Sequence, residues 1–310
     1  MNKKLVVKPS GIGGQAVLEG VMMKNRDRYA VAVRKPDGEI EVEKGHCQSL
    51  RDKYFVCDLP IIRGVVTFVE SLVLGMKSLT DSSKYYEDEE EENRQQMDDA
   101  AKERHEKIET TFTVILSIVL AVGIFIVLPF FISELLKSII KSAKVLAVIE
   151  GIIRIILFIG YVFAISFVED IKRVFMYHGA EHKTINCVEH MLPLTVENVR
   201  KQSREHKRCG TSFIFIVLFI SIIFFIFIRV DNMWLKVLYR IVLVPVIAGV
   251  SYEFIRLAGK SENALVNILS KPGMMLQKLT TKEPDDSMIE VAIASVEAVF
   301  DWKKFQEDSK

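Results

Sequence analysis

Long uncharged apolar runs are the feature that most constrains this chain of 310 residues. A helix needs about 17–25 predominantly apolar residues to cross the hydrocarbon core of a bilayer. Four stretches are long enough, and the first and third of them contain no charged residue. The sequence therefore predicts a mostly α-helical integral membrane protein with about four transmembrane helices. The four stretches cover residues 110–133, 145–168, 211–228 and 237–257.

Two of these stretches contain charged residues, so each of them also fits a buried helix of a soluble domain. Glu150 and Arg154 lie four residues apart in the second stretch and can pair on one helix face. Arg240 lies near the start of the fourth stretch, where its charged end can extend to the membrane surface. Because the first and third stretches favour insertion so strongly, we interpret all four as spans.

Basic residues predict the orientation of these spans. Cytoplasmic loops of membrane proteins carry an excess of Lys and Arg. Segment 169–210, between the second and third spans, is rich in both, whereas the turn before the fourth span has only Arg229 and Lys236. We therefore expect segment 169–210 and both termini in the cytoplasm. The connection between the first two spans fits less clearly, because it contains Lys137, Lys141 and Lys144.

The spans divide the chain into four regions. In residues 1–80, period-two alternation around the turn at 36–38 predicts a β-hairpin, followed by an amphipathic or re-entrant helix. This small β-containing region is expected in the cytoplasm. Residues 81–110 indicate an acidic polar linker or helix. Residues 111–258 form the membrane domain, and 259–310 form a cytoplasmic segment with an amphipathic helix capped by Asp286 or Ser287.

Composition excludes several classes of function. A formal charge of +1 excludes a nucleic-acid binder that works by bulk basicity. Four cysteines without C-x-x-C spacing are too few for a disulfide scaffold. The sequence contains no G-x-S-x-G and no Walker motif. The expected partner is the lipid bilayer and not nucleic acid, while a protein partner and a homo-oligomer stay open.

The sharpest motif is His178-Gly-Ala-Glu181-His182. On a helix, the four-residue spacing places both imidazoles on one face with Glu181 beside them. Two imidazoles can bind a divalent metal, and an adjacent carboxylate can act as general base toward water. The order H-x-x-E-H is that of one zinc-peptidase class. The motif predicts a divalent metal site, with zinc favoured, His178 and His182 as ligands and Glu181 as catalytic base. It also fits a plain helix at the membrane surface.

Further candidate ligands lie where the spans begin and end. His206 and Cys209 precede the third span with the H-x-x-C spacing of a ligand pair. Glu253, near the end of the fourth span, offers a carboxylate or an ion pair with Arg256. Two opposed ligand pairs would make a closed structural site, whereas three protein ligands would leave one position open for catalysis. The sequence leaves both arrangements possible.

Three polar residues inside otherwise apolar motifs of the N-terminal region are candidates to bind substrate. These residues are Gln15, Glu19 and Arg63. We expect them to line the same cleft as the metal site.

Several motifs together resemble those of the YqhQ-type family of uncharacterised bacterial membrane proteins. This domain-of-unknown-function family is described as predicted metal-dependent enzymes, and the resemblance covers nearly the whole chain. It implies a membrane protein with a metal-type motif and supplies no substrate. The motifs include Gly13-Gly-Gln-Ala-Val-Leu-Glu-Gly-Val-Met-Met23, Tyr177-His-Gly-Ala-Glu-His-Lys183, Arg208-Cys-Gly-Thr-Ser-Phe213 and Tyr252-Glu-Phe-Ile-Arg-Leu-Ala-Gly259.

These observations favour a metal-dependent hydrolase whose site lies at the cytoplasmic surface of the membrane. The alternative is a non-enzymatic membrane scaffold or assembly factor with a structural metal site. A transporter ranks last because the sequence has no evident inverted repeat.

Overall fold

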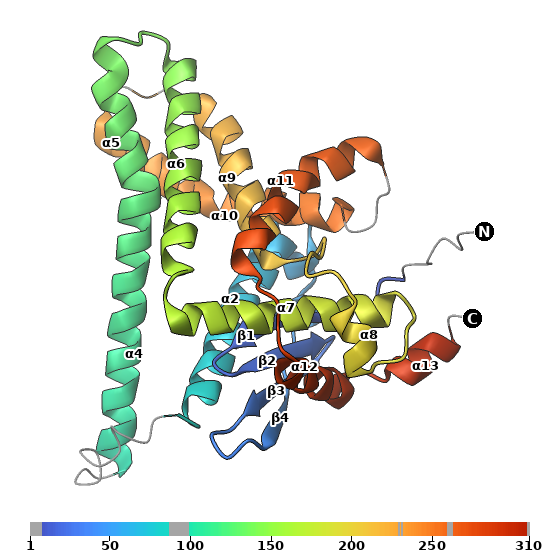
Figure 1. The fold of residues 1–310 in the computed structure, drawn as a ribbon. Helices are drawn as coiled ribbons and strands as arrows, with labels where there is room; N and C mark the ends of the chain where they lie inside the picture. The colour runs from blue at the N-terminus through green and yellow to red at the C-terminus, as the bar shows by residue number, and fades with distance from the viewer. Residues whose placement is uncertain (1–7, 87–98, 229, 231, 259–262, 309–310) are drawn as a thin grey trace. The chain divides into compact units, whose positions relative to one another are not determined.

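The computed structural model describes residues 8–86, 99–228, 230, 232–258 and 263–308 (Figure 1). The chain divides into two compact units. The first unit contains Met1–Tyr86, Val162–Ile214 and Gly249–Lys310, and the second contains Glu87–Tyr161 and Phe215–Ala248. The acidic run at 87–92, expected to be a linker or solvated helix, lies outside the described residues.

A four-stranded antiparallel sheet forms the centre of the first unit. Its strands β1 (Gly13–Val17), β2 (Gly20–Asn25), β3 (Arg28–Arg34) and β4 (Ile40–His46) follow one another in chain order. The predicted hairpin is confirmed as β3 and β4, with Gly38 at φ +88° in the connecting turn. Strand β2 was not predicted from the sequence. Its first four residues, which are all buried, lack the alternation of apolar and polar residues that marks a half-buried strand.

Helices α7 (Glu169–Glu189) and α12 (Asp286–Val299) pack against this sheet. The predicted apolar face of α12 is confirmed, since Met288, Val291, Ala292, Ser295, Val296 and Val299 are all buried. Its cap differs by one residue from the expectation of Asp286 or Ser287. Asp285 has extended backbone, and its carboxylate accepts a hydrogen bond from the amide of Met288 at 2.9 Å. Local backbone geometry therefore selects Asp285 as the N-cap.

Shorter elements complete the first unit. The helix expected after the hairpin is confirmed as α2 (Ile62–Ser83), whereas α11 (Ala264–Thr280) was not anticipated because Pro272 interrupts its sequence. The remaining elements are α1 (Leu50–Lys53), the 3-10 turn η1 (Phe55–Asp58), α8 (Val196–Arg200) and α13 (Trp302–Glu307).

Long apolar helices make up the second unit. The first is continuous over Ile108–Ser138 and contains a π-helical turn, η2 (Gly123–Val127), just before Pro129. This helix, α6 (Ala143–Ile165) and α10 (Met233–Ala258) are long and apolar enough to cross a membrane. The third predicted span is α9 (Gly210–Ile226), a shorter helix of 17 residues. The first helix comprises α4 (Asp99–Val122), η2, α5 (Leu128–Leu135) and η3 (Leu136–Ser138).

Charged side chains lie buried between these apolar helices. The predicted pair of Glu150 and Arg154 is present, with a guanidinium nitrogen 2.8 Å from the carboxylate. The structure corrects the expectation for Arg240, whose side chain does not extend to a surface. Arg240 is only 5% exposed and binds both oxygens of Glu150. The carboxylate holds Arg240 in the interior because burial without a counter-charge would be far more costly.

Candidate metal centre

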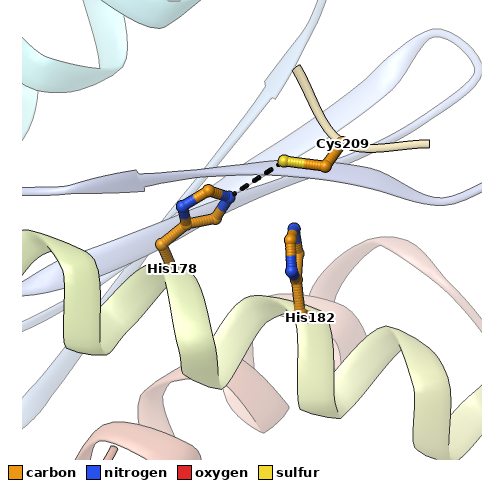
Figure 2. A group of neighbouring side chains, drawn as sticks. All are labelled: His178, His182 and Cys209. Carbon is orange, nitrogen blue, oxygen red and sulfur yellow. Dashed lines mark hydrogen bonds between the residues drawn. The ribbon is translucent and has the colours of Figure 1, made fainter. Parts of the chain in front are cut away.

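Three predicted ligands from two parts of the sequence come together in the first unit. His178 and His182 project to the same side of α7, and Cys209 faces them from the loop before α9 (Figure 2). One ligand atom from each residue lies within 4.8 Å of the other two. The sulfur of Cys209 lies 3.3 Å from Nε2 of His178. These three side chains could hold one metal ion.

Backbone carbonyls orient both imidazoles. Nδ1 of His178 donates to the carbonyl of Thr280 at 2.9 Å, and Nδ1 of His182 donates to the carbonyl of Arg204. A carbonyl oxygen only accepts, so each of these Nδ1 atoms carries a proton and a neutral ring has its lone pair on Nε2. Nε2 of His182 is buried and has no hydrogen-bond partner. This is the arrangement in which metal-binding histidines are usually held.

Gly179 allows the chain segment after α11 to reach His178. A Cβ atom at this position would lie 2.1 Å from the carbonyl oxygen of Lys282, so a larger side chain would push that segment away. The amide of Lys282 in turn donates to the carbonyl of Phe175 at 2.8 Å. The glycine that weakens helix propensity in the motif therefore serves the packing that places the Thr280 carbonyl against His178.

The sulfur of Cys209 is buried and surrounded by donors. The amide of Thr211 lies 3.3 Å from it, at the first turn of α9. Burial alone would raise the pKa of the thiol. The charges and hydrogen bonds of His178 and His182 lower it by a larger amount, so the net pKa lies well below its ordinary value. For His178, burial lowers the pKa, but the charge and hydrogen bond of Cys209 raise it to about 9. The lowered pKa of Cys209 favours a thiolate, the form that binds metal, whereas the raised pKa of His178 favours a proton on its Nε2, which a metal ion would have to displace.

Glu181 lies beside the ligands but is not one of the three. Its Oε2 is buried without a hydrogen-bond partner. Burial raises the pKa of its carboxyl above the ordinary value, although His178 and His182 counteract part of that rise. Gly14 of β1 packs directly on this side chain, because a Cβ there would lie 2.9 Å from its Cγ and Cδ. A carboxyl with a raised pKa next to a metal site suits a general base.

His206 lies next to the group and belongs to another network. Its Nε2 is 3.3 Å from a carboxylate oxygen of Glu189, which also accepts from Ser10 and Arg208. Burial raises the pKa of Glu189, but the hydrogen bond from His206 and the charge of Arg208 lower it to about 2 overall. The structure therefore does not aim His206 at the ligand group, although its ring centroid is 5.9 Å from that of His182.

Three further site candidates are engaged in ion pairs. Glu253 accepts two hydrogen bonds from the guanidinium of Arg63, so the structure does not bring either residue into the ligand group. Arg256 is a more distant partner of the same carboxylate, at 3.8 Å. Glu19 is likewise paired with Arg173. These three candidates, Glu253, Arg63 and Glu19, stabilise contacts between separate segments of the first unit.

Gln15 lines a cavity of about 730 Å³ in the first unit. Its amide oxygen packs closely on α2, because a Cβ at Gly75 would lie 2.2 Å from it. Gly14, which packs on Glu181, lines the same cavity. Charged side chains of both signs, including Lys24, Arg51 and Glu70, also line it. The three ligands and Glu181 do not line this cavity, so the structure does not place the substrate candidates and the metal group in one cleft.

Sequence reasoning missed the groups that orient the ligands. The carbonyls of Thr280 and Arg204 leave no residue-type signal, because every residue has a carbonyl. The network of Glu189, Arg208 and Ser10 joins segments far apart in the sequence. A chain position alone gives no sign of such pairings.

The class of this protein follows from comparison with known families. A family model described as "Protein of unknown function (DUF1385)" matches residues 59–302. The chain belongs to this family, and the resemblance that its motifs indicated is confirmed.

A protein of Bacillus subtilis (strain 168) named "Uncharacterized protein YqhQ" is 37% identical to this chain over 290 residues. The alignment covers 93% of this chain and 91% of that protein. No solved structure matches the chain. Since neither description states an activity, any function must be argued from the site.

Proposed function

We propose that the protein is a metal-dependent hydrolase in which His178, His182 and Cys209 bind a divalent ion, zinc being favoured. The observation that carries this proposal is the buried Nε2 of His182, which has no hydrogen-bond partner and lies with the other two ligand atoms. A buried polar atom without a partner is costly in a folded protein. A bound cation would satisfy the lone pair of Nε2 and the charge of the thiolate together.

The donor set and spacing fit zinc. Imidazole nitrogens and thiolates are ligands that zinc takes in proteins, and catalytic zinc sites have three protein ligands and keep a fourth position for water or substrate. Bond lengths of about 2.0–2.3 Å in a tetrahedron put ligand atoms about 3.3–3.6 Å apart. The three atoms lie within 4.8 Å of one another, so small movements would complete the site.

Glu181 would supply the proton transfers. A divalent cation at this position would make water more acidic and polarise the bond to be cleaved. The carboxylate of Glu181 would take a proton from the attacking water and deliver it to the leaving group. Its carboxylate lies beside the ligands with a buried Oε2 that has no hydrogen-bond partner, so it is placed to accept that proton. Gln15 and the cavity of about 730 Å³ would bind the rest of the substrate.

The proposal includes four spans with both termini in the cytoplasm. Residues 8–86, 169–210 and 263–308, which lie outside the four spans, belong to one compact unit, and this supports placing them on one side of a membrane. The two intervening segments, 87–161 and 215–248, leave that body and return to it, which takes an even number of crossings each time. Since α10 is long enough to cross, α9 would be the other crossing of its pair. Its 17 residues are at the lower limit for a span.

Metal content of the purified full chain tests the proposal. We expect about one zinc per chain for the wild type and loss of most of it in His182→Ala. His190→Ala is the matched control, because His190 ends the same helix and binds Gln202. Equal zinc in the wild type and His182→Ala, measured by elemental analysis, would refute a metal site on these residues.

One observation favours the alternative, a scaffold with a structural metal. The three ligands come from α7 and from the loop before α9, and His182 and Cys209 are 1% and 7% exposed. A metal there would fasten two segments together in a dry environment, as structural zinc sites do. The two functions differ in what Glu181 does, because a structural site has no use for a general base.

A further inference from the structure

A second cluster of charged side chains lies in the other unit, between apolar helices, and the metal chemistry does not involve it. The Glu150 carboxylate on α6 binds two guanidinium groups, those of Arg154 and Arg240. All three residues are at most 5% exposed. Two cations therefore share one anion in an apolar environment.

In this triad of Glu150, Arg154 and Arg240 the polar groups have hydrogen-bond partners, but two positive charges face one negative charge. Arg154 also donates to the carbonyl of Phe125 in the π-helical turn and to the hydroxyl of Ser221, while Arg240 donates to the carbonyl of Lys236. The rings of Phe130 and Phe225 lie 4.6 Å and 4.8 Å from the guanidinium carbons of Arg240 and Arg154. Aromatic faces attract cations but carry no net charge. One positive charge thus stays uncompensated by these groups.

A small cavity opens onto the triad. Its volume is about 90 Å³, well above the roughly 10–15 Å³ that one water needs. Among the described residues that line it, four are cations and two are carboxylates. One of the carboxylates, Glu134, already pairs with Lys137 and Lys236. The charged lining residues are Glu134, Lys137, Lys141, Glu150, Lys236 and Arg240.

These lining residues share one end of the helices. They come from α5 and the turn after it, the start of α6, the end of α9 and the start of α10. In the proposed topology this is the outer end of the spans. Lys137 and Lys141 are the residues that fitted poorly with a cytoplasmic bias of positive charge. A binding site for an anion would explain why Lys137 and Lys141 lie at the outer end of the spans.

The geometry points to a site that binds a phosphate group, carried by an anionic lipid of the outer leaflet or free in solution. Cations at several positions around a cavity of this size match the several oxygens of a phosphate. Basic pockets between transmembrane helices bind anionic lipid head groups on the cytoplasmic or matrix side of membranes, and the same chemistry would serve at the outer end of these helices. Leu135 and Ile139, which come close in the chain to the lining residues Glu134 and Lys141, are exposed apolar side chains that would meet the acyl chains. The bound phosphate would compensate the extra charge of the triad.

Native mass spectrometry of the full chain in detergent tests this site. The probes are phosphatidylglycerol, phosphatidylcholine with the same acyl chains, and inorganic phosphate. The variant is Lys141→Gln/Lys236→Gln, which changes the rim and leaves the triad intact. Lys144→Gln is the matched control, because Lys144 is exposed at the start of α6 and does not line the cavity.

We expect phosphatidylglycerol to bind the wild type and Lys144→Gln equally, and the double variant about 30-fold more weakly. Each lysine near an anionic group contributes about 1 kcal/mol, and 1.4 kcal/mol is tenfold. The same pattern with inorganic phosphate alone would support the site with a free ligand. Equal binding of phosphatidylglycerol and phosphate by all three proteins, or by none, would overturn it. If the double variant is poorly folded, Lys141→Gln alone should give an intermediate loss, and no loss would overturn the site.

Discussion

The sulfur of Cys209 lies 3.3 Å from Nε2 of His178, although 31 residues separate the two in the sequence. This contact joins the start of α9 to the middle of α7. The carbonyl of Thr280 holds the imidazole from its other nitrogen, and the amide of Thr211 approaches the sulfur. The orientation of the ligand atoms therefore depends on three separate segments of the first unit. Substitutions in each of these segments should therefore weaken metal binding, either by removing a ligand or by shifting one.

Replacing Cys209 tests whether the thiolate is a ligand. Serine is a much poorer zinc ligand at neutral pH, so Cys209→Ser should weaken zinc binding at least 100-fold. Competition with a fluorescent chelator measures the affinity. Cys187→Ser is the control, since Cys187 is a buried cysteine on α7, the helix of His178 and His182, and lies outside the ligand group. Unchanged affinity in Cys209→Ser would instead indicate a site completed by oxygen or nitrogen ligands.

Replacing Gly179 tests the packing that supports His178. Gly179→Ala improves helix propensity by about 1 kcal/mol but places Cβ 2.1 Å from the carbonyl of Lys282. We expect a net destabilisation of about 1–3 kcal/mol, as for overpacked sites, together with zinc binding weakened about 10–100-fold. Gly160→Ala in α6 is the control, because a Cβ there meets nothing within 4 Å. Thermal unfolding and zinc titration measure the two effects, and equal behaviour of the two variants would contradict the packing argument.

The lowered pKa of Glu189 predicts how acid affects the stability of the first unit. Its pKa is about 2 in the folded protein, below the ordinary value of about 4.3. Its stabilising contribution is therefore present above about pH 4.3 and is lost as the pH falls toward 2. Glu189→Gln should cost about 3 kcal/mol at pH 7, because it leaves buried His206 and half-buried Arg208 without their anion.

Thermal unfolding between pH 3 and 7 checks this prediction. The wild type should lose stability as the pH falls from 5 to 3, and the loss should be smaller in Glu189→Gln. Glu307→Gln, at an exposed position on α13, should behave as the wild type. Parallel pH curves for the wild type and Glu189→Gln would show that Glu189 is not the titrating group.

Local patterns in the sequence predicted a large part of the fold. The alternation and turn at 36–38 gave the β3–β4 hairpin, and helical periodicity gave the buried face of α12. Spacing of four residues placed His178 and His182 on one face of α7, where their ring centroids are 4.4 Å apart. Each of these features depends on residues close together in the chain, which is why a sequence pattern can encode it.

Contacts between distant segments were beyond such patterns. H-x-x-C spacing suggested His206 and Cys209 as a pair, but only Cys209 joins the histidines of α7, because Glu189 engages His206. Arg240 binds a carboxylate 90 residues away, where sequence reasoning expected it at a surface. In both cases a buried counter-charge decides the side-chain direction, and the counter-charge comes from another helix.

Membrane topology can be tested with single cysteines. In a background of Cys47→Ser and Cys57→Ser, Glu197→Cys on α8 should react with a membrane-impermeant maleimide only after the cells are opened. Asn232→Cys, between α9 and α10, should react in intact cells. Both positions are exposed, so accessibility alone does not distinguish them. If Asn232→Cys is also protected in intact cells, α9 does not cross and the four-span arrangement is wrong.

Glu181 separates catalysis from a structural role of the metal. Glu181→Gln keeps the shape of the side chain and removes its ability to take a proton. If Glu181 is the general base, this variant should keep about one zinc per chain and the wild-type unfolding temperature, yet fail to complement a deletion strain. A loss of activity of about 10²–10⁴-fold is typical when a general base is removed. Elemental analysis, thermal unfolding and complementation are measured on the same three proteins: wild type, Glu181→Gln and His182→Ala. Full complementation by Glu181→Gln, with zinc retained, would favour the structural site, whereas loss of zinc as complete as in His182→Ala would make Glu181 a ligand.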